Sequence, residues 1–316
     1  MMFDTRTHVS LREPLQRIAG ESVRIGTSSW KYPGWCGQIY DEARYLTRGK
    51  FSESRFEREC LEEYAEIFPT VCVDAGYYKF PSPQYLEGLC KQVPDSFRFG
   101  FKVTDTITIK NYTNLPRFGV LAGKPNEHFL DADLFKKAFL SSFDRVQDKI
   151  GVFIFEFSHF YPKDFSHGRD FVAMLDGFLG QLPKAYSYAV EVRNKTLLQP
   201  EYLLMLASHG VAHVFNSWTK MPELAEQIEI PGSFTTDFAV ARLLLKPGRT
   251  YEQAVSTFSP YKSVQDANNS VREAAKKLVQ KAKGGKRPSF VFVNNRLEGN
   301  APTTISAIVE AQTAKK

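Results

Sequence analysis

Five charged side chains follow short apolar runs along this chain. They are Asp74, Lys102, Glu156, Glu191 and Arg193. Carboxylates can accept or donate a proton, and cations can bind an anionic group or stabilise a negative charge that develops during a reaction. Because buried charges are costly unless they are paired, the set predicts a shared polar pocket with perturbed pKa values. The alternative is an ion network that satisfies itself and only stabilises the fold.

The neighbours of the two glutamates suggest different roles for them. Glu156 lies between Phe155 and Phe157, so we expect burial to raise its pKa and to make it a proton donor. Glu191 lies two residues before Arg193, whose charge favours the ionised carboxylate. Asp74 completes the set of three catalytic candidates. Lys102 and Arg193 are expected to bind an anionic group of the substrate.

A metal site is the weaker interpretation of the same region. Its possible ligands are Asp74, Glu156, Glu191 and His159. The nearby Lys102 and Arg193 would repel a divalent cation, so we predict no metal and no other cofactor. A glycine-rich phosphate loop, a GxSxG elbow and a CxxC pair are all absent from the sequence.

The candidate residues depend on eight apolar runs for their positions. These runs are Val23–Gly26, Thr70–Val73, Phe97–Phe101, Gly151–Phe155, Tyr186–Val190, Val211–Phe215, Phe238–Leu245 and Ser289–Val293. Helical patterns lie between them, including Ser54–Phe68, Ala132–Lys149, Val264–Ala282 and Gly299–Ala314. Alternating strands and helices of this number predict a TIM-like (β/α)8 barrel, an α/β fold whose chemistry lies at the carboxyl ends of the strands. Residues 23–316 are predicted to form this single domain, and residues 1–22 a loosely ordered extension or a short helix over its base.

Alternation along the strands predicts which side chains enter the barrel. Phe99 and Phe101 share one face of their strand, and Lys102 lies on the other. In the same way, Glu156 and Glu191 lie opposite the large apolar residues of their own strands. The apolar face of each strand is expected to meet the helices, which directs the charged residues into the barrel mouth.

Length and composition limit the class of protein. The 316 residues suit one large barrel, and a net charge of +6 with 43% hydrophobic residues is typical of a globular protein with a mild preference for anionic partners. No run of about 18 apolar residues predicts a membrane span, and no secretory signal is apparent. Four unpaired-looking cysteines favour a reducing environment, so we expect a cytoplasmic protein that does not bind membranes.

Two connections are too long to be simple turns. They span Trp30–Ser52 and Thr104–Asp131, and both follow predicted strands. Connections of this length are usually lids or binding loops, and a rigid structural flap is the alternative. Among the aromatic residues of the first loop, Trp30 is expected in the pocket because it follows the strand directly, whereas Trp35 and Tyr40 are expected to pack the loop.

Three segments together resemble a known family. The first runs from Ile25 to Trp30 as IGTSSW and continues with Tyr32 and Trp35; the second is EVR at 191–193; the third is FVNN at 292–295, followed by GNA at 299–301. This pattern is similar to the domain-of-unknown-function 72 (DUF72) family, also called the YecE-like proteins. The resemblance extends from about Val23 to the C-terminus. It implies a TIM-like barrel with a deep polar mouth and no defined reaction.

The resemblance also implies pocket residues at the matching positions. Those that serve as substrate-binding candidates here are Ser28, Trp30, Tyr32, Tyr78, Lys102, Arg193, Asn294 and Asn295. The chain departs from the family where Cys72 replaces a common acid, Asp74 replaces an asparagine and Glu156 replaces a glutamine. These differences indicate a divergent subgroup in which the acid has moved from the second strand to the fourth.

Three functions remain open from the sequence. The leading one is an enzyme that acts on a small polar, anionic metabolite, such as a sugar or sugar phosphate, as a hydrolase, isomerase or lyase. The first alternative is a nucleic-acid-binding or nuclease-like barrel, which the sequence pI of about 9.0 and the basic segment Lys276–Arg287 favour. The second is a scaffold without catalysis, held by a structural ion network. The oligomeric state is not indicated.

Overall fold

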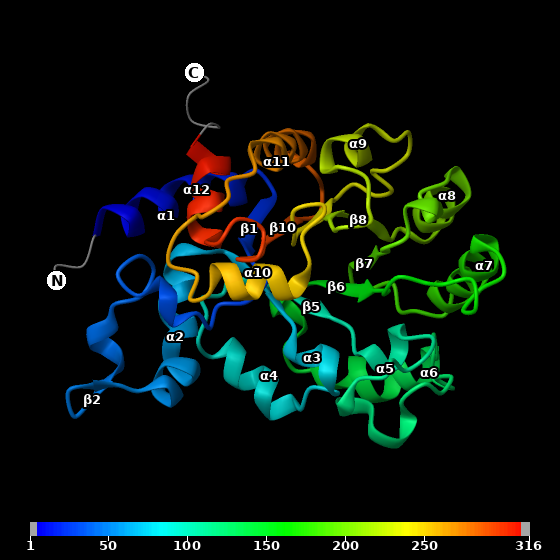
Figure 1. The fold of residues 1–316 in the computed structure, drawn as a ribbon, viewed down its shortest axis with the longest axis horizontal. Coiled ribbons are helices and arrows are strands. Elements are labelled where there is room, and N and C mark those ends of the chain that lie inside the picture. Colours follow the sequence, from blue (N-terminus) through cyan, green and yellow to red (C-terminus); the bar gives the residue numbers. More distant parts are fainter. Residues whose placement is uncertain (1–4, 311–316) are drawn as a thin grey trace.

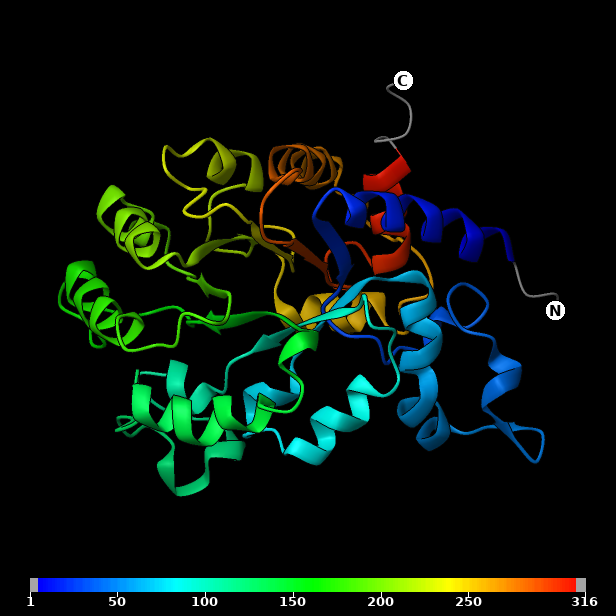
Figure 2. The same ribbon diagram turned by 180° about the vertical axis from the view of Figure 1, so that it is seen from behind.

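Eight parallel strands close into a barrel. The computed structural model describes the fold of residues 5–310 and the side chains of residues 11–310. Around the barrel the strands are β1 (Val23–Thr27), β10 (Ser289–Val293), β9 (Val240–Leu243), β8 (Ala212–Ser217), β7 (Tyr188–Glu191), β6 (Ile150–Glu156), β5 (Arg98–Lys102) and β4 (Thr70–Val73). Strand β1 pairs with both β10 and β4, which closes the sheet. The predicted (β/α)8 barrel is confirmed, and helices surround it (Figures 1 and 2).

The helices occupy the connections between the strands. They are α1 (Thr5–Gly20), α2 (Glu53–Ile67), α3 (Ala75–Tyr78), α4 (Pro83–Cys90), α5 (Asp105–Thr108), α6 (Ala132–Leu134), α7 (Gly168–Leu179), α8 (Pro200–His209), α9 (Leu224–Glu229), α10 (Tyr251–Phe258), α11 (Asn269–Ala282) and α12 (Ala301–Glu310). A small antiparallel hairpin, β2 (Leu46–Thr47) with β3 (Lys50–Phe51), lies in the first long loop. The helix expected over 264–282 begins only at Asn269, where Asn268 caps it. The last residues of the helix expected over 299–314 lie outside the described residues.

The helix expected over Ala132–Lys149 is broken into short turns. After α6 come a π-turn, η4 (Phe135–Phe139), and two 3₁₀ turns, η5 (Leu140–Phe143) and η6 (Gln147–Lys149). A π-turn is wider than an α-turn, so residues four apart stay near one face. Here it keeps Phe139 and Phe143 over β6, with ring centroids 5.7 and 4.9 Å from that of Phe153.

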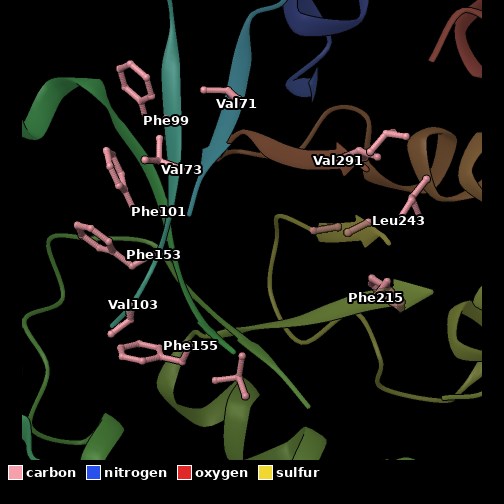
Figure 3. Close-up of a cluster of buried hydrophobic side chains, with 14 of the residues drawn as sticks. Val71, Val73, Phe99, Phe101, Val103, Phe153, Phe155, Phe215, Leu243 and Val291 are labelled. Carbon is pink, nitrogen blue, oxygen red and sulfur yellow. The ribbon is translucent and has the colours of Figure 1, made fainter. Parts of the chain in front are cut away.

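Strand alternation separates two hydrophobic cores. The outward residues, among them Phe99, Phe101, Phe153 and Phe155, pack towards the helices (Figure 3). The inward residues fill the barrel with smaller side chains such as Cys72, Val152 and Ile154, and with two stacked phenylalanines of β10. The faces predicted for these strands are therefore correct. The inner face ends at the carboxyl side in Lys102, Glu156 and Glu191, and the last two are register partners.

Of the two expectations for the N-terminal segment, a loosely ordered extension or a short helix, the structure shows a helix over Thr5–Gly20. Leu11, Leu15 and Ile18 of α1 are fully buried, and α1 contacts β1, α2 and α12. Their spacing of four and then three residues puts all three on one face of the helix. That face covers apolar surface which the barrel would otherwise expose, and this explains the order of α1.

No helix within residues 5–310 combines the length and apolar character that a bilayer span requires. The four cysteines carry free thiols; Cys60 and Cys72 are buried, and Cys36 and Cys90 are half-buried. Burial raises the pKa of Cys72 to about 12, so its thiol stays protonated inside the barrel.

Candidate functional site

A cavity of about 440 Å³ lies at the carboxyl ends of the barrel strands. Its charged lining consists of Asp74, Lys102, Arg117, Glu156, Arg193, Arg242 and Arg296. Its aromatic lining consists of Tyr77, Tyr78, Trp218 and Tyr251. The volume falls in the range of small-molecule sites, and a mixed polar and aromatic wall suits a polar ligand with a ring. The barrel therefore has its cavity at the end where this fold carries chemistry.

Glu156 is the centre of a buried ion network beneath the cavity. Its Oε2 lies 2.9 Å from Lys102 Nζ and 2.5 Å from Arg242 Nη1. Its Oε1 lies 2.7 Å from Arg193 Nη2. The Glu156 side chain is only 4% exposed, so these contacts occur with little screening by water. Three cations from three strand ends thus converge on one carboxylate.

Glu191 completes this network from the neighbouring strand. Its Oε2 accepts a hydrogen bond from Arg242 Nη1 at 2.5 Å, and its Oε1 lies 3.3 Å from Arg193 Nε. The side chain is fully buried. Because β6 and β7 place the two glutamates side by side, one guanidinium can bridge them, and Arg242 does so. Both glutamates are therefore paired with cations, and Glu191 lies below the cavity without lining it.

The expected role of Glu156 as a proton donor is wrong. Burial alone would raise its pKa, but the charges of Arg193, Lys102 and Arg242 and the hydrogen bond from Arg242 outweigh burial and hold the pKa well below its usual range. The flanking phenylalanines suggested an apolar surrounding, yet both point outward towards the helices. Glu156 is therefore a fixed anion that positions three cations.

Arg242 is a cavity-lining residue that the sequence reasoning missed, as are Arg117 and Arg296. It lies in the middle of the apolar run of β9, and its side chain is 3% exposed. Burial lowers its pKa, but Glu191 and Glu156 more than offset that effect and raise it well above the usual value. The signal was present, because a single arginine between Ala241 and Leu243 on a buried strand needs a carboxylate partner.

Asp74 is the carboxylate that faces the cavity. Its side chain is 36% exposed, and its Oδ1 is buried without a hydrogen-bond partner in the part of the chain that the structure describes. That atom lies 3.9 Å from both Lys102 Nζ and Arg242 Nη2, which is too far for a direct hydrogen bond. Asp74 thus faces two cations without a direct hydrogen bond to either of them.

Four of the five cations that line the cavity lie against an aromatic ring, and the exception is Arg242. Arg193 Cζ is 3.8 Å from the ring centroid of Trp218, and Lys102 Nζ is 3.8 Å from that of Tyr77. Arg117 Cζ is 5.1 Å from Tyr78, an exposed residue. Cation–aromatic contacts hold long flexible side chains in place. The walls of the cavity are consequently preorganised without a ligand.

The structure brings part of the predicted site together and separates the rest. Asp74, Tyr78, Lys102, Glu156 and Arg193 line the cavity, with Glu191 below them. The residues of the predicted site outside this lining are Ser28, Trp30, Tyr32, Asn294 and Asn295.

The residues outside the lining have structural contacts. Trp30 is 5% exposed, and its carbonyl accepts a hydrogen bond from the Tyr40 hydroxyl. Asn295 Oδ1 accepts from the Ala301 amide at 2.7 Å at the start of α12, and Asn294 Oδ1 accepts from the Arg296 amide at 2.9 Å. The expectation that Trp30 enters the pocket is therefore wrong, and both asparagines hold the turn after β10.

Ser28 and Tyr32 also lie away from the lining. The Ser28 amide donates to the Val293 carbonyl at 3.0 Å, and its buried hydroxyl has no partner among the described residues. Burial raises the pKa of Tyr32 to about 12, and its ring packs 4.9 Å from that of Trp35. The first long loop therefore packs on itself, whereas residues 109–117 of the second loop reach the cavity.

The possible metal ligands contact cations or backbone instead of one another. Asp74 and Glu156 lie beside Lys102 and Arg242, and His159 Nδ1 is 3.1 Å from the Arg193 carbonyl. Within residues 5–310, no group of three or more histidine, cysteine, aspartate or glutamate side chains is arranged to bind a metal ion. Cations occupy the space that a divalent ion would need.

Comparison with known proteins gives the family. The profile described as "Protein of unknown function DUF72" matches residues 24–316. The chain belongs to the DUF72 family. Solved DUF72 structures are similar to it, including one from Enterococcus faecalis V583 (TM-score 0.62, 18% identity, 93% of this chain and 98% of that chain) and one from Thermotoga maritima MSB8 (0.59, 19%, 92% and 98%). None of the curated proteins matches this DUF72 chain.

Proposed function

We propose that this DUF72 protein is an enzyme that binds a small polar, anionic metabolite of the sugar or sugar phosphate class in the mouth cavity. It acts by general acid–base chemistry, as a hydrolase, isomerase or lyase. The observation that carries this proposal is Asp74 Oδ1, which has no hydrogen-bond partner among the described residues and lies 3.9 Å from Lys102 Nζ and from Arg242 Nη2. An unsatisfied carboxylate oxygen at a cavity wall, opposite two fixed cations, suits a reacting hydroxyl group.

The chemistry follows from this arrangement. A ligand hydroxyl at this position donates its hydrogen to Asp74 and accepts a hydrogen bond from Lys102 or Arg242. When Asp74 removes the proton, the two cations stabilise the negative oxygen that forms. Glu156 and Glu191 do not take part in proton transfer; they hold the cations at the correct distance. The rings of Tyr77 and Trp218 offer flat surfaces for the apolar face of a sugar.

A catalytically silent scaffold is the second candidate, because Glu156 and Glu191 are already satisfied by cations. Such a network would stabilise the strand ends with or without a ligand. The two candidates differ at Asp74, which contributes no hydrogen bond through Oδ1 to the folded protein. An enzyme needs this carboxylate, whereas a scaffold does not.

The nucleic-acid alternative finds less support in the basic segment. Within Lys276–Arg287, five of the cations are paired: Lys276 with Glu273, Lys277 and Lys281 with Glu229, Lys283 with Glu21, and Arg287 with Asp237. These pairs compensate much of the local charge that phosphates of a nucleic acid would need. The segment also leads into the amino end of β10, opposite the cavity.

A thermal-shift screen followed by an activity assay tests the proposal. The panel contains sugars, sugar phosphates, organic acids and short oligonucleotides at two salt concentrations, because a ligand of the folded state raises the melting temperature. We expect a hit among the small anionic compounds that changes little with salt. An oligonucleotide hit that weakens steeply with salt would favour the nucleic-acid alternative.

Asp74→Asn is the decisive variant, and Asp144→Asn, on an exposed residue, is its control. Asp74→Asn is expected to melt close to the wild type and to lower turnover of the hit by about 10²–10⁴-fold. The control should retain wild-type turnover. Normal turnover by Asp74→Asn would refute the acid–base role.

A further inference from the structure

We propose that the cavity contains a phosphate-monoester subsite on its β9–β10 side, with Arg296 as the residue that binds the phosphate. This inference rests on the proposed function and deepens it, because it assigns a place to the anionic end of the ligand. The reacting hydroxyl would lie at Asp74, and the phosphate would lie at Arg296, another part of the wall of the same cavity.

The first argument is the charge balance of the cavity wall. Four of its five cations have carboxylate partners: Lys102, Arg193 and Arg242 in the buried network, and Arg117 at 2.5 Å from Asp105 Oδ2. Within residues 11–310, Arg296 has no carboxylate oxygen within ion-pair distance. One positive charge at the wall is therefore left for a ligand, and a phosphate monoester carries between one and two negative charges at neutral pH.

Arg296 is held in position although its charge is uncompensated. Its Cζ lies 4.5 Å from the ring centroid of Tyr251, which is a cation–aromatic contact. Its amide donates to Asn294 Oδ1 at 2.9 Å, which fixes the turn after β10. A guanidinium is planar, and two of its N–H groups match two phosphate oxygens.

The buried Arg242 is a second cation on the β9–β10 side of the cavity. It lies on β9, its side chain is 3% exposed, and it also lines the cavity. Its Nε is buried without a hydrogen-bond partner among the described residues. Arg242 and Arg296, contributed by β9 and by the turn after β10, therefore lie on one side of the cavity.

The place of Arg296 in the barrel favours phosphate over other anions. Strands β9 and β10 are the seventh and eighth of the barrel, and the loops after them contribute Leu245, Tyr251 and Arg296 to the cavity. In (β/α)8 barrels these two loops frequently form a phosphate site together with the start of a short extra helix. Both α10 and α11 lie between β9 and β10 in the chain. Helix α11 packs against its neighbours α9 and α12 in the outer ring of helices, so α10 is the additional helix of this connection.

Helix α10 has the features of that extra helix. In both views it projects onto the middle of the molecule and not into the ring of helices (Figures 1 and 2). Its first residue, Tyr251, lines the cavity. The Thr250 hydroxyl accepts from the Gln253 amide at 3.2 Å, whereas the amides of Tyr251 and Glu252 have no acceptor in the described chain. Open amides at a helix start add donors for an anion beside Arg296.

Titration with inorganic phosphate by calorimetry tests the subsite. We compare the wild type with Arg296→Gln, with Arg296→Lys and with Arg169→Gln, which removes one charge from an exposed arginine on α7. Arg296→Gln is expected to bind phosphate at least about tenfold more weakly, the loss of one hydrogen bond to a charged group. Arg296→Lys should recover part of the affinity, and Arg169→Gln should bind as the wild type does.

Several results would overturn the subsite. The first is that the wild type shows no saturable phosphate binding, and the second is that Arg296→Gln binds phosphate as tightly as the wild type does. The third is that Arg169→Gln loses as much phosphate affinity as Arg296→Gln, and the fourth is that acetate binds as tightly as phosphate. The ligand-free melting temperature of Arg296→Gln shows whether the variant is folded, and Arg296→Lys retains the charge should it be unstable. Asp74→Asn should bind phosphate with wild-type affinity. The phosphate titration therefore tests the subsite separately from the acid–base role of Asp74.

Discussion

Replacement of Glu156 by glutamine should destabilise the fold strongly. Glutamine keeps the size of the side chain but removes its charge. Arg193 and Arg242 then retain Glu191 as their buried carboxylate, and Lys102 retains only Asp74, at 3.9 Å. Removal of one partner from a buried ion pair typically costs about 3–5 kcal/mol, because the remaining charge stays desolvated. The cavity lets water reach Arg193, whose side chain is 14% exposed, so we expect the lower end, about 3 kcal/mol.

Urea unfolding at pH 7 measures this loss, with Glu59→Gln as a matched control. Glu59 also contacts two arginines, Arg55 at 2.9 Å and Arg58 at 2.8 Å, but on the surface of α2. Exposed ion pairs contribute little to stability, so the control should unfold with the wild type. The two glutamates have similar contact distances, and the difference between the variants therefore measures the effect of burial.

The loss should also depend on pH in a defined direction. The folded-state pKa of Glu156 lies well below its usual range, and that of an unfolded glutamate is about 4.3. A carboxyl group with a lowered folded pKa contributes stability that is fully present above the unfolded pKa and is lost as the pH falls below it. The difference in the free energy of unfolding between wild type and Glu156→Gln should thus stay constant from pH 8 to pH 5 and become smaller below about pH 4.3. Two results would refute the buried network as the cause of the destabilisation. One is a loss in the free energy of unfolding below about 1 kcal/mol, and the other is a difference between the two proteins that does not become smaller in acid.

Two further changes test the packing of the barrel. His213 is 2% exposed, neither ring nitrogen has a hydrogen-bond partner, and burial lowers its pKa to about 4. His213→Leu should therefore gain about 1 kcal/mol in urea unfolding at pH 7. This gain in the free energy of unfolding should grow as the pH falls from about 6.5, because only the unfolded wild type then binds the proton. A variant that is less stable than the wild type at both pH 7 and pH 5 would contradict the prediction. Gly26→Ala should lower the melting temperature, at a cost of about 1–3 kcal/mol, because its Cβ would lie 1.9 Å from the Thr70 carbonyl oxygen. Gly88→Ala on α4 meets nothing within 4 Å and should gain about 0.5–1 kcal/mol; equal melting of the two glycine variants would count against the close approach of β1 and β4.

Local patterns were sufficient for most of the fold. The apolar runs predicted every barrel strand, and their alternation separated Phe153 and Phe155 from Glu156. Local signals also existed where the prediction failed. Helix α10 was not predicted, although Thr250 and Gln253 form a capping box three residues apart. The expected helix over 132–149 failed because packing against β6 favoured a π-turn.

The candidate site was less predictable than the fold. Strand ends identified Asp74, Lys102, Glu156, Glu191 and Arg193 as neighbours, because the carboxyl ends of parallel strands meet at one mouth. The sequence motifs after β1 and β10 pointed equally to the pocket, yet those residues hold turns and fill the first loop. A motif shows that a residue type is needed and does not show which way its side chain points.

The amino-acid sequence by itself determined the barrel and the inner and outer faces of its strands, because strand alternation and helix caps are properties of neighbouring residues. Its motifs also indicated the DUF72 family. Only the tertiary structure decided the charge state of Glu156 and the open position of Asp74. Arg242, which controls both, is 86 residues away from Glu156 along the chain. Electrostatic energy depends on distances through space and on burial, and both arise only when the strands close into a barrel.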